Sequence, residues 1–468
     1  MPHVATSASD LLARLEGIVT IAGDGLAVVD EERLRGDAIR DLAWTAAFGE
    51  DDAAVAAAQW IVWEASQALG ARSASIHELY MARARGEVSG FTVPAVNIRA
   101  QTFDMARTVF DAATAGDVGA VILELARSEQ TYTYQRPIDY ATAVLAGAIA
   151  AEWRAPVFIQ GDHYQFNAKK YADDPEAVTE EIRRACRLAV EAGYRNIDID
   201  SSTLVDLSKE TLDEQQRENY VRAAELTAYI RSLEADGVTI SVGGEIGEVG
   251  KKNSTEDELR AYLAGYEREL AARAPRAPGL SKVSVQTGTS HGGKPLPGGG
   301  VADVKIDFEV LRRLGEVARE HGAAGAVQHG ASTLPDELFH RFRQVETAEI
   351  HLATGFQNLL YEHPAFPESL HRKVEAWVHE NAADERKPDQ TDEQFVYTTR
   401  KKAIGPFKRE LWDLRVRSQI FAAQHRKLTF LFTELGVLGT REMVDTYVHP
   451  VELHRPLPDA LRSVVAAR

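Results

Sequence analysis

The sequence predicts an α/β protein built as a closed (β/α)8 TIM barrel with N-terminal and C-terminal helical extensions. Between about residues 90 and 362, short runs rich in β-branched residues alternate eight times with longer segments of helical period. Most of these runs are almost continuously apolar, which is typical of parallel strands buried on both faces. Eight β–α repeats favour a closed barrel over an open doubly wound sheet.

The predicted strands follow one another at the spacing that a barrel requires. They are 91–98, 119–125, 155–161, 195–200, 238–246, 282–288, 325–330 and 347–353. Helical segments lie between them, for example 175–192, 212–233 and 308–320, where apolar residues recur at i, i+3 and i+4.

The segments outside the repeats differ from them in composition. Residues 1–90 are rich in alanine and predict helices packed against the barrel, whereas residues 363–468 are helical and charged. We therefore expect an N-terminal helical extension (1–90), a catalytic barrel (91–362) and a C-terminal helical extension (363–468).

Composition restricts the class of function. The chain has 468 residues, with 70 Asp plus Glu against 53 Lys plus Arg, and a formal charge of −17. This acidic balance argues against nucleic acid or an anionic membrane as partner, because both attract net-basic proteins. The single cysteine, Cys186, excludes internal disulfides and cysteine-rich zinc modules. Since no apolar run has the length of a signal peptide core or a membrane helix, we expect a soluble, cytoplasmic protein.

Three of the fourteen histidines end predicted strands. His163 ends the third strand, His291 follows the sixth and His329 follows the seventh. The active site of a (β/α)8 barrel lies at the carboxyl ends of its strands. Imidazoles from three strand ends can hold one divalent ion and leave a coordination position open for substrate. The alternative for each histidine is a hydrogen-bonded core or surface residue.

Two carboxylates occupy similar positions. Asp162 directly precedes His163, so in a regular strand its side chain points to the other side. It would lie close to the metal without necessarily binding it, which suits a general acid/base. The alternative is a helix cap or a residue that orients a histidine ligand. Glu245 ends the fifth strand and could hold a metal transiently or assist proton transfer, or could form a structural ion pair.

Glycine-containing turns after the last strands have the character of an anion site. Gly292, Gly330 and Ser332 follow strands six and seven, and Thr354 follows strand eight. Glycine lets backbone N–H groups approach a phosphate, and the start of a helix favours negative charge. Glycines at such turns are also common for purely geometric reasons.

The polar loop 247–256 carries two glycines and could be a lid over the site. Glu248 or Glu256 would supply an acid/base, and Lys251 or Lys252 a cation. A solvated loop in which Ser254-Thr255 starts the next helix is the alternative.

The motifs at these positions resemble those of the class II, metal-dependent ketose-bisphosphate aldolases, the fructose- and tagatose-bisphosphate aldolase family. The matching pieces cover about residues 90–360 in the family's order; they are PVFIQGDH, NIDIDSSTL, VGGEIG, GTSHG, QHGAS and IHLAT. The resemblance implies that His163, His291 and His329 are the zinc ligands and that Asp162 is the acid/base at the ketose C4 hydroxyl. Glu245 would be a second position for the metal. The phosphate cradle would include Gly292, Gly330, Ser332 and Thr354.

The activity implied by the resemblance is reversible aldol cleavage of a phosphorylated ketose such as fructose 1,6-bisphosphate, giving dihydroxyacetone phosphate and an aldehyde. Zn²⁺ would be the cofactor; other divalent metals could replace it, and we also consider a monovalent cation. We expect a homodimer or homotetramer. The alternatives are a non-catalytic aldolase-like subunit and a metal-dependent barrel enzyme, an epimerase or retro-aldolase, that acts on a different sugar.

Several residues differ from the family's usual pattern. His351 in IHLAT stands where the family has Asn, and Glu124 replaces a small polar residue after the second strand. His351 and Asn97, at the end of the first strand, are further candidate substrate contacts. A basic cluster in the C-terminal extension could reach a distal phosphate, or could be a solvated helix face; it comprises Arg400, Lys401, Lys402, Lys408 and Arg409.

Overall fold

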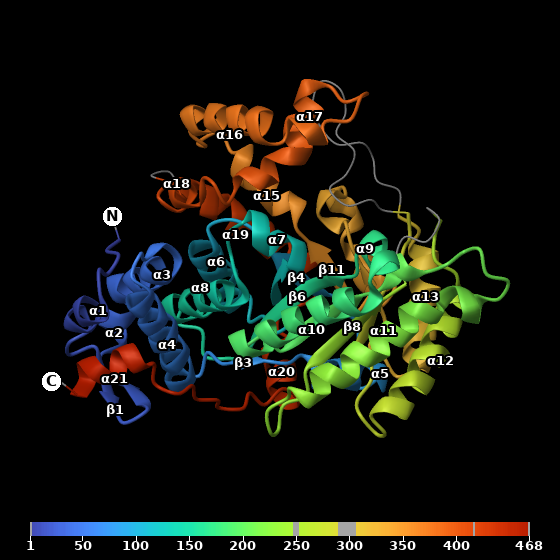
Figure 1. The fold of residues 1–468 in the computed structure, drawn as a ribbon, viewed down its shortest axis with the longest axis horizontal. Helices are drawn as coiled ribbons and strands as arrows, with labels where there is room; N and C mark the ends of the chain where they lie inside the picture. The colour runs from blue at the N-terminus through green and yellow to red at the C-terminus, as the bar shows by residue number, and fades with distance from the viewer. Residues whose placement is uncertain (1, 247–251, 289–305, 415–416, 467–468) are drawn as a thin grey trace.

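The computed structural model describes residues 2–246, 252–288, 306–414 and 417–466. At its centre eight parallel strands form a closed barrel (Figure 1). The strands pair in chain order from β4 to β11, with the β6–β7 pairing part of the same ring and β11 pairing β4 to close it. The predicted (β/α)8 barrel is therefore confirmed.

All eight predicted strands are present, most of them shorter than predicted. They are β4 (Val93–Asn97), β5 (Ile122–Ala126), β6 (Val157–Gln165), β7 (Asn196–Asp200), β8 (Ser241–Glu245), β9 (Lys282–Ser284), β10 (Ala326–Gln328) and β11 (Glu349–Leu352). The exception is β6, which continues four residues beyond its predicted end at residue 161. A ninth, two-residue strand, β3 (Ser73–Ala74), pairs with the first residues of β6.

Helices surround the barrel and connect its strands. They are α6 (Thr102–Ala115), α7 (Arg127–Tyr132), α8 (Pro137–Ala150), α9 (Ala168–Asp173), α10 (Pro175–Ala192), α11 (Leu212–Ser232), α12 (Glu256–Arg273), α13 (Phe308–Glu320), α14 (His340–Gln344) and α15 (Thr354–Tyr361). The bounds of α10 match the prediction because its end signals are strong. The Asp174 side chain accepts the Ala177 N–H before Pro175 at the first helical position, and Gly193 ends the helix at φ 102°.

The N-terminal segment packs against the barrel helices as a layer. It contains α1 (Ala8–Arg14), α2 (Glu31–Arg33), a π-helical turn (Leu34–Ala38), α3 (Ile39–Phe48), α4 (Asp52–Leu69) and α5 (His77–Ala84). An antiparallel hairpin of β1 (Val19–Ala22) and β2 (Gly25–Val28) interrupts these helices. The sequence did not predict it, because its four-residue strands are too short for a clear alternation of polar and apolar residues.

The C-terminal segment reaches both ends of the barrel. It contains α16 (Glu368–Asn381), α17 (Asp392–Thr399), α18 (Lys408–Trp412), α19 (Arg417–Glu434), α20 (Arg441–Tyr447) and α21 (Asp459–Ala466). In Figure 1, α16 and α17 lie above the barrel, and the chain between α20 and α21 returns along its lower edge to α4. The main apolar core runs from Ala5 to Leu461 and includes parts of both extensions, and a second cluster between Leu360 and Ile420 joins α15, α16 and α18. No helix in the described ranges is long and apolar enough to cross a membrane.

Candidate active site

A distortion of β6 brings Asp162 and His163 into one cluster. The pairing register between β6 and β7 shifts between Gly161 and Tyr164, and His163 has a φ of 45°. A regular strand would point neighbouring side chains to opposite faces, as we predicted, but here Asp162 Oδ1 lies 3.7 Å from His163 Nε2. Bulges and left-handed non-glycine residues are concentrated at functional sites, where they re-aim side chains.

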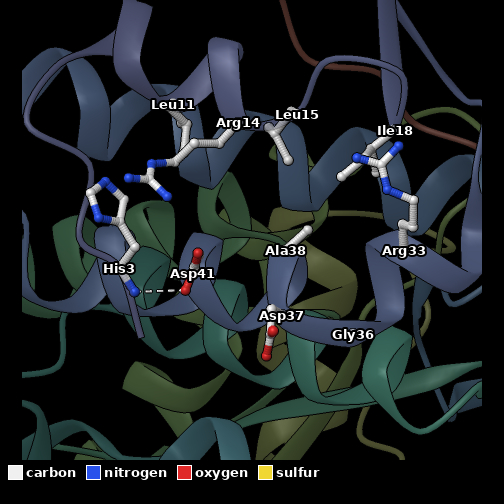
Figure 2. A pocket seen from close by; sticks show the side chains of 10 residues that line it. All are labelled: His3, Leu11, Arg14, Leu15, Ile18, Arg33, Gly36, Asp37, Ala38 and Asp41. Carbon is white, nitrogen blue, oxygen red and sulfur yellow. Dashed lines mark hydrogen bonds between the residues drawn. The ribbon is translucent and has the colours of Figure 1, made fainter. Parts of the chain in front are cut away.

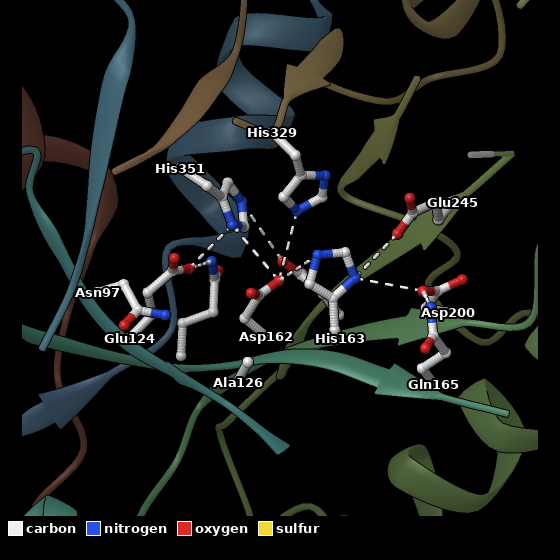
Figure 3. Close-up of polar contacts among 12 residues, drawn as sticks. Asn97, Glu124, Ala126, Asp162, His163, Gln165, Asp200, Glu245, His329 and His351 are labelled. Carbon is white, nitrogen blue, oxygen red and sulfur yellow. Dashed lines mark hydrogen bonds and ion pairs between the residues drawn. The ribbon is translucent and has the colours of Figure 1, made fainter. Parts of the chain in front are cut away.

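Three imidazoles surround the Asp162 carboxylate (Figure 3). Its Oδ1 lies 3.4 Å from His329 Nε2 and 3.4 Å from His351 Nδ1. The rings of His163 and His329 are stacked with centroids 4.3 Å apart, and those of His329 and His351 are 4.1 Å apart. One ligand atom each from Asp162, His163 and His329 lies within 4.8 Å of the others. These three side chains are therefore close enough to share one cation.

Two further carboxylates contact His163 from the other side. Its Nδ1 lies 3.2 Å from Asp200 Oδ2 on β7 and 3.3 Å from Glu245 Oε2 at the end of β8. Asp200 also accepts hydrogen bonds from the side chains of Gln165 and Ser202, which fix its position. Asp200 therefore orients His163, and Glu245 lies where it could exchange a proton or take part in metal binding.

The electrostatics give these groups different protonation states. Burial by itself raises the pKa of Asp162, but the charges of His163 and His351 hold that pKa well below its usual range. Burial and the charges of His351 and His163 lower the pKa of His329 well below its usual value. Burial and the Asp200 charge raise the pKa of Glu245 to about 7. The site thus combines an ionised carboxylate, a neutral imidazole and a carboxyl group that titrates near neutrality.

The donor set fits a divalent metal. Nitrogen and carboxylate-oxygen ligands suit zinc or a similar borderline ion. The pKa of His163 lies well above its usual value; burial opposes this, and the charges of Asp162 and Glu245 cause it. A metal would therefore displace a proton from His163, as metal binding to imidazole generally does.

Next to this cluster the barrel interior holds a charged network, of which the sequence predicted His351 as a site residue but not Lys282 or Glu349. Lys282 Nζ donates to Gln160 Oε1 at 2.7 Å and to Glu349 Oε1 at 2.5 Å, and lies 2.9 Å from Asp198 Oδ2. His351 joins the network to Asp162, since its Nε2 lies 2.8 Å from Glu349 Oε1 and its Nδ1 lies 3.1 Å from Glu124 Oε2.

A pattern in the sequence could have revealed these residues. Charged or amide side chains alternate with apolar ones in strands that are otherwise buried: Glu124, Gln160, Asp162, Asn196, Asp198, Asp200, Lys282, Glu349 and His351. Alternation places one set toward the barrel axis. Charge is unusual there, because barrel interiors are mostly filled by branched apolar residues.

The predicted phosphate-binding residues are partly described. Gly330 has φ 70° and precedes a 3-10 turn, Ala331–Thr333. The Ser332 Oγ accepts the Gly355 N–H at 3.1 Å, which joins this turn to the first residues of α15, where Thr354 lies. His291 and Gly292 lie outside the described residues, and so do Glu248 and Lys251 of the predicted lid.

Other predicted residues have identifiable partners. Asn97 Nδ2 donates to Glu129 Oε2 at 2.7 Å, and its buried Oδ1 has no hydrogen-bond partner among the described residues. Thr255 is the N-cap of α12, with its side chain accepting the Glu258 N–H. The predicted start of this helix at Ser254-Thr255 is therefore confirmed, while the lid or solvated loop before it stays a prediction, because residues 247–251 lie outside the described residues.

Two residues of the basic cluster in the C-terminal extension are buried, whereas Arg409 is exposed, so the cluster as a whole is not one solvated helix face. Arg400 is 7% exposed and forms an ion pair with Glu362 at 2.6 Å. Lys408 is 9% exposed and donates to the Tyr134 carbonyl oxygen at 2.9 Å. Both side chains therefore fasten the extension to neighbouring segments of the chain.

A cavity of about 490 Å³ lies elsewhere, in the N-terminal extension (Figure 2). His3, Arg14 and Asp41 border it, with the His3 backbone N–H donating to Asp41 Oδ1 at 2.7 Å. It is built from α1, the π-helical turn and α3, away from the carboxyl ends of the strands. It is therefore not part of the cluster around Asp162.

Comparison with known proteins gives one family and several distant structures. Residues 80–408 match the family model described as fructose-bisphosphate aldolase class-II. The YdjI aldolase of Escherichia coli K12 is 17% identical, with 74% of this chain and 98% of that chain covered and a TM-score of 0.41. The fructuronate-tagaturonate epimerase UxaE of Cohnella laeviribosi, with one glycerol bound, is 10% identical, with 91% and 90% covered and a TM-score of 0.55. No curated protein matches the chain.

Proposed function

The chain belongs to the class II fructose-bisphosphate aldolase family, and from this premise we propose that it is a metal-dependent aldolase that reversibly cleaves a phosphorylated ketose. The observation that carries the proposal is the convergence of Asp162, His163, His329 and Glu245 at the carboxyl ends of three strands, β6, β8 and β10. Two imidazoles beside two carboxylates suit metal binding together with proton transfer.

The residues of the cluster have separate roles in this proposal. His163 and His329, joined by the predicted ligand His291, would hold Zn²⁺ or a similar divalent ion. When bound, such an ion polarises a substrate carbonyl and stabilises the negative charge that develops on its oxygen. Asp200 keeps His163 oriented through its contact at 3.2 Å.

Asp162 is the proposed acid/base. Its carboxylate is ionised because neighbouring imidazolium charge lowers its pKa, so it can accept the proton of the C4 hydroxyl as the C3–C4 bond breaks. In the reverse direction it returns that proton to the oxygen of the aldehyde. Glu245, with a pKa of about 7, is suited to move the second proton, the one that is exchanged at C3.

Cationic side chains near the end of β4 support an anionic substrate. Arg99 forms an ion pair with Glu129 at 2.7 Å, and its charge lowers the pKa of the nearby Lys401, for which burial is the larger cause. Lys401 has no ion pair with any residue that the structure describes. We propose that Lys401 contacts a phosphate or carboxylate at one end of the substrate and that Ser332 and Thr354 lie near the other.

A second candidate is C4 epimerisation of an unphosphorylated ketose acid. It is favoured by His351, which replaces the family's usual Asn and lies 3.4 Å from Asp162. The epimerase likeness, which extends over 91% of this chain and so includes both extensions, supports it as well. The two reactions share the cleavage of the C3–C4 bond. If the aldehyde formed by this cleavage rotates to present its opposite face before the bond re-forms, the configuration at C4 is inverted.

One experiment separates the two candidates. The zinc-loaded protein is incubated with fructose 1,6-bisphosphate, tagatose 1,6-bisphosphate, fructuronate or tagaturonate, and products are followed by proton NMR. The aldolase predicts triose phosphate from a bisphosphate, whereas the epimerase predicts interconversion of the two uronates with no released fragment. Asp162→Asn is the control, because it should slow either reaction by about 10² or more. No product from any substrate would refute both candidates.

A further inference from the structure

A second cavity lies at the amino ends of the strands, opposite the candidate active site. Its volume is about 370 Å³, and its walls come from the barrel, from α4 and from the C-terminal segment that runs between α20 and α21 (Figure 1). The residues that matter here are Trp63, Arg187, Arg195, Ile240, Leu453 and Arg455.

Arg195 is a buried cation in this wall. It directly precedes β7 and is only 7% exposed. Its Nη1 donates to the carbonyl oxygens of Val190 and Tyr194, both at 2.9 Å. Among the described residues it forms no ion pair with a carboxylate, although buried charges are almost always paired. The remaining nitrogens of this guanidinium therefore lack an anionic partner.

Arg455 is a second cation in the same cavity. Its guanidinium lies 3.7 Å from the centre of the Trp63 ring, and its Nη2 donates to the Glu191 carbonyl oxygen at 3.1 Å. The buried Glu64 does not pair with this guanidinium, since its oxygens contact His454 Nδ1 at 2.6 Å and the Arg455 backbone N at 2.8 Å.

The charge of the buried Arg195 opposes the charge of the half-buried Arg455. Burial lowers the pKa of Arg195 to about 10, and burial together with the Arg195 charge lowers the pKa of Arg455 to about 10. Arg187 on α10, half exposed, adds a third guanidinium, which lies 4.0 Å from the carboxylate of Glu191 at the same cavity. Three cations therefore gather here in a chain whose formal charge is −17. A bound anion would offset this repulsion.

We propose that this cavity binds a small phosphate ester. Two guanidiniums with unused N–H groups match the oxygens of a phosphate, which arginine recognises in a bidentate manner. The apolar side chains of Ile240 and Leu453 provide a wall for the organic part of such a ligand. Because the walls belong to both the barrel and the C-terminal segment, the ligand would hold the two together and raise the melting temperature.

The test measures binding without catalysis, and the cavity variants below distinguish this site from the phosphate contacts proposed at the active site. Inorganic phosphate, glycerol phosphate, glycerol and succinate are titrated into the full-length protein by calorimetry in an uncharged buffer. We expect a glycerol phosphate site that depends on the cavity arginines and binds more tightly than phosphate, and we expect glycerol not to bind. Absence of phosphate and glycerol phosphate binding at millimolar concentration would overturn the proposal, and so would tighter binding of succinate.

Variants locate the binding site. Arg455→Gln should weaken glycerol phosphate binding by about tenfold or more, the scale of one lost charge-assisted contact. Arg187→Gln, at a half-exposed position that tolerates change, should weaken it by a smaller factor and keeps the test decisive if Arg455→Gln does not fold. Arg312→Gln, an exposed arginine paired with Glu309 on α13, is the matched control and should bind normally. Unchanged affinity in both cavity variants would place the anion elsewhere and overturn the proposal.

Discussion

Replacing Lys282 with methionine should destabilise the protein by about 3–5 kcal/mol, the typical cost of removing one partner from a buried ion pair. Lys282 and Glu349 are almost completely buried, with side-chain exposures of 1% and 0%. The ammonium group contacts Gln160, Asp198 and Glu349. Methionine fills a similar volume, so the expected loss comes from charge rather than from a cavity.

The destabilisation caused by Lys282→Met should decrease as the pH falls. Burial raises the pKa of Glu349, but the Lys282 charge outweighs it and holds that pKa below the ordinary value of 4.5. In the wild type, this depressed pKa contributes stability at pH above 4.5, which is lost as pH falls through the folded-state pKa. Without Lys282 the pKa of Glu349 rises. Protonation of Glu349 at acidic pH therefore removes the unpaired buried charge and reduces the destabilisation of the variant. The difference in unfolding free energy should therefore be largest above neutrality and shrink toward about pH 4.5.

Urea unfolding at two pH values measures this difference. The double variant Lys282→Met/Glu349→Gln should recover part of the loss, because the uncompensated carboxylate is then absent. Lys209→Met is the matched control: Lys209 is 54% exposed, lies 3.6 Å from Asp206, and its removal should cost less than about 1 kcal/mol. A loss below about 1 kcal/mol for Lys282→Met would refute the reasoning that the network is a paired, desolvated charge cluster.

Three further predictions concern the site and its support. Asp162→Asn should retain bound metal and reduce turnover by about 10² or more, measured by metal analysis and product formation; unchanged turnover would remove Asp162 from the acid/base role. Gly161→Ala should distort the bulge, since an added Cβ would collide with the Tyr164 ring; we expect a stability loss of about 1–3 kcal/mol and weaker metal binding, and normal values for both would contradict this. His77→Gln should remove an acid-sensitive part of stability. Burial and then the Arg231 charge lower the pKa of His77 from 6.5 to about 4, so the unfolded chain takes up this proton first and roughly 3 kcal/mol is lost as pH falls from 6.5 toward 4. Urea unfolding should show a smaller acid-induced loss of unfolding free energy in the His77→Gln variant than in the wild type. An equal loss would contradict the lowered pKa of His77.

The strand order and the principal helices could be predicted because their signals are local. Eight apolar runs at regular spacing define the barrel, and capping residues such as Asp174 and Gly193 define helix ends. Asp162 and His329 could be placed near each other from the barrel rule alone, since both follow strands whose carboxyl ends meet.

The orientation of His163, the pairing within the charged network inside the barrel and the burial of Lys408 could not be predicted, because each depends on tertiary contacts. The bulge that turns His163 toward the same side as Asp162 arises from pairing between β6 and β7, which no local pattern encodes. Alternation within the strands indicates which charged side chains face the barrel axis, but the pairing of Lys282 with Glu349, 67 residues apart, forms only when the barrel closes. The burial of Lys408 likewise requires the C-terminal segment to fold back onto Tyr134.

A zinc titration of chelator-treated protein tests most directly whether the chain is a metal-dependent aldolase. The readout is triose phosphate release from fructose or tagatose 1,6-bisphosphate. We expect no cleavage without metal, a linear rise in activity with added zinc, and a plateau at about one zinc ion per chain, as a single site built from His163 and His329 requires. His163→Ala should require a large excess of zinc or remain inactive. Full cleavage by the metal-free protein, or no cleavage of either ketose at saturating zinc, would contradict the proposal that the chain is a metal-dependent aldolase.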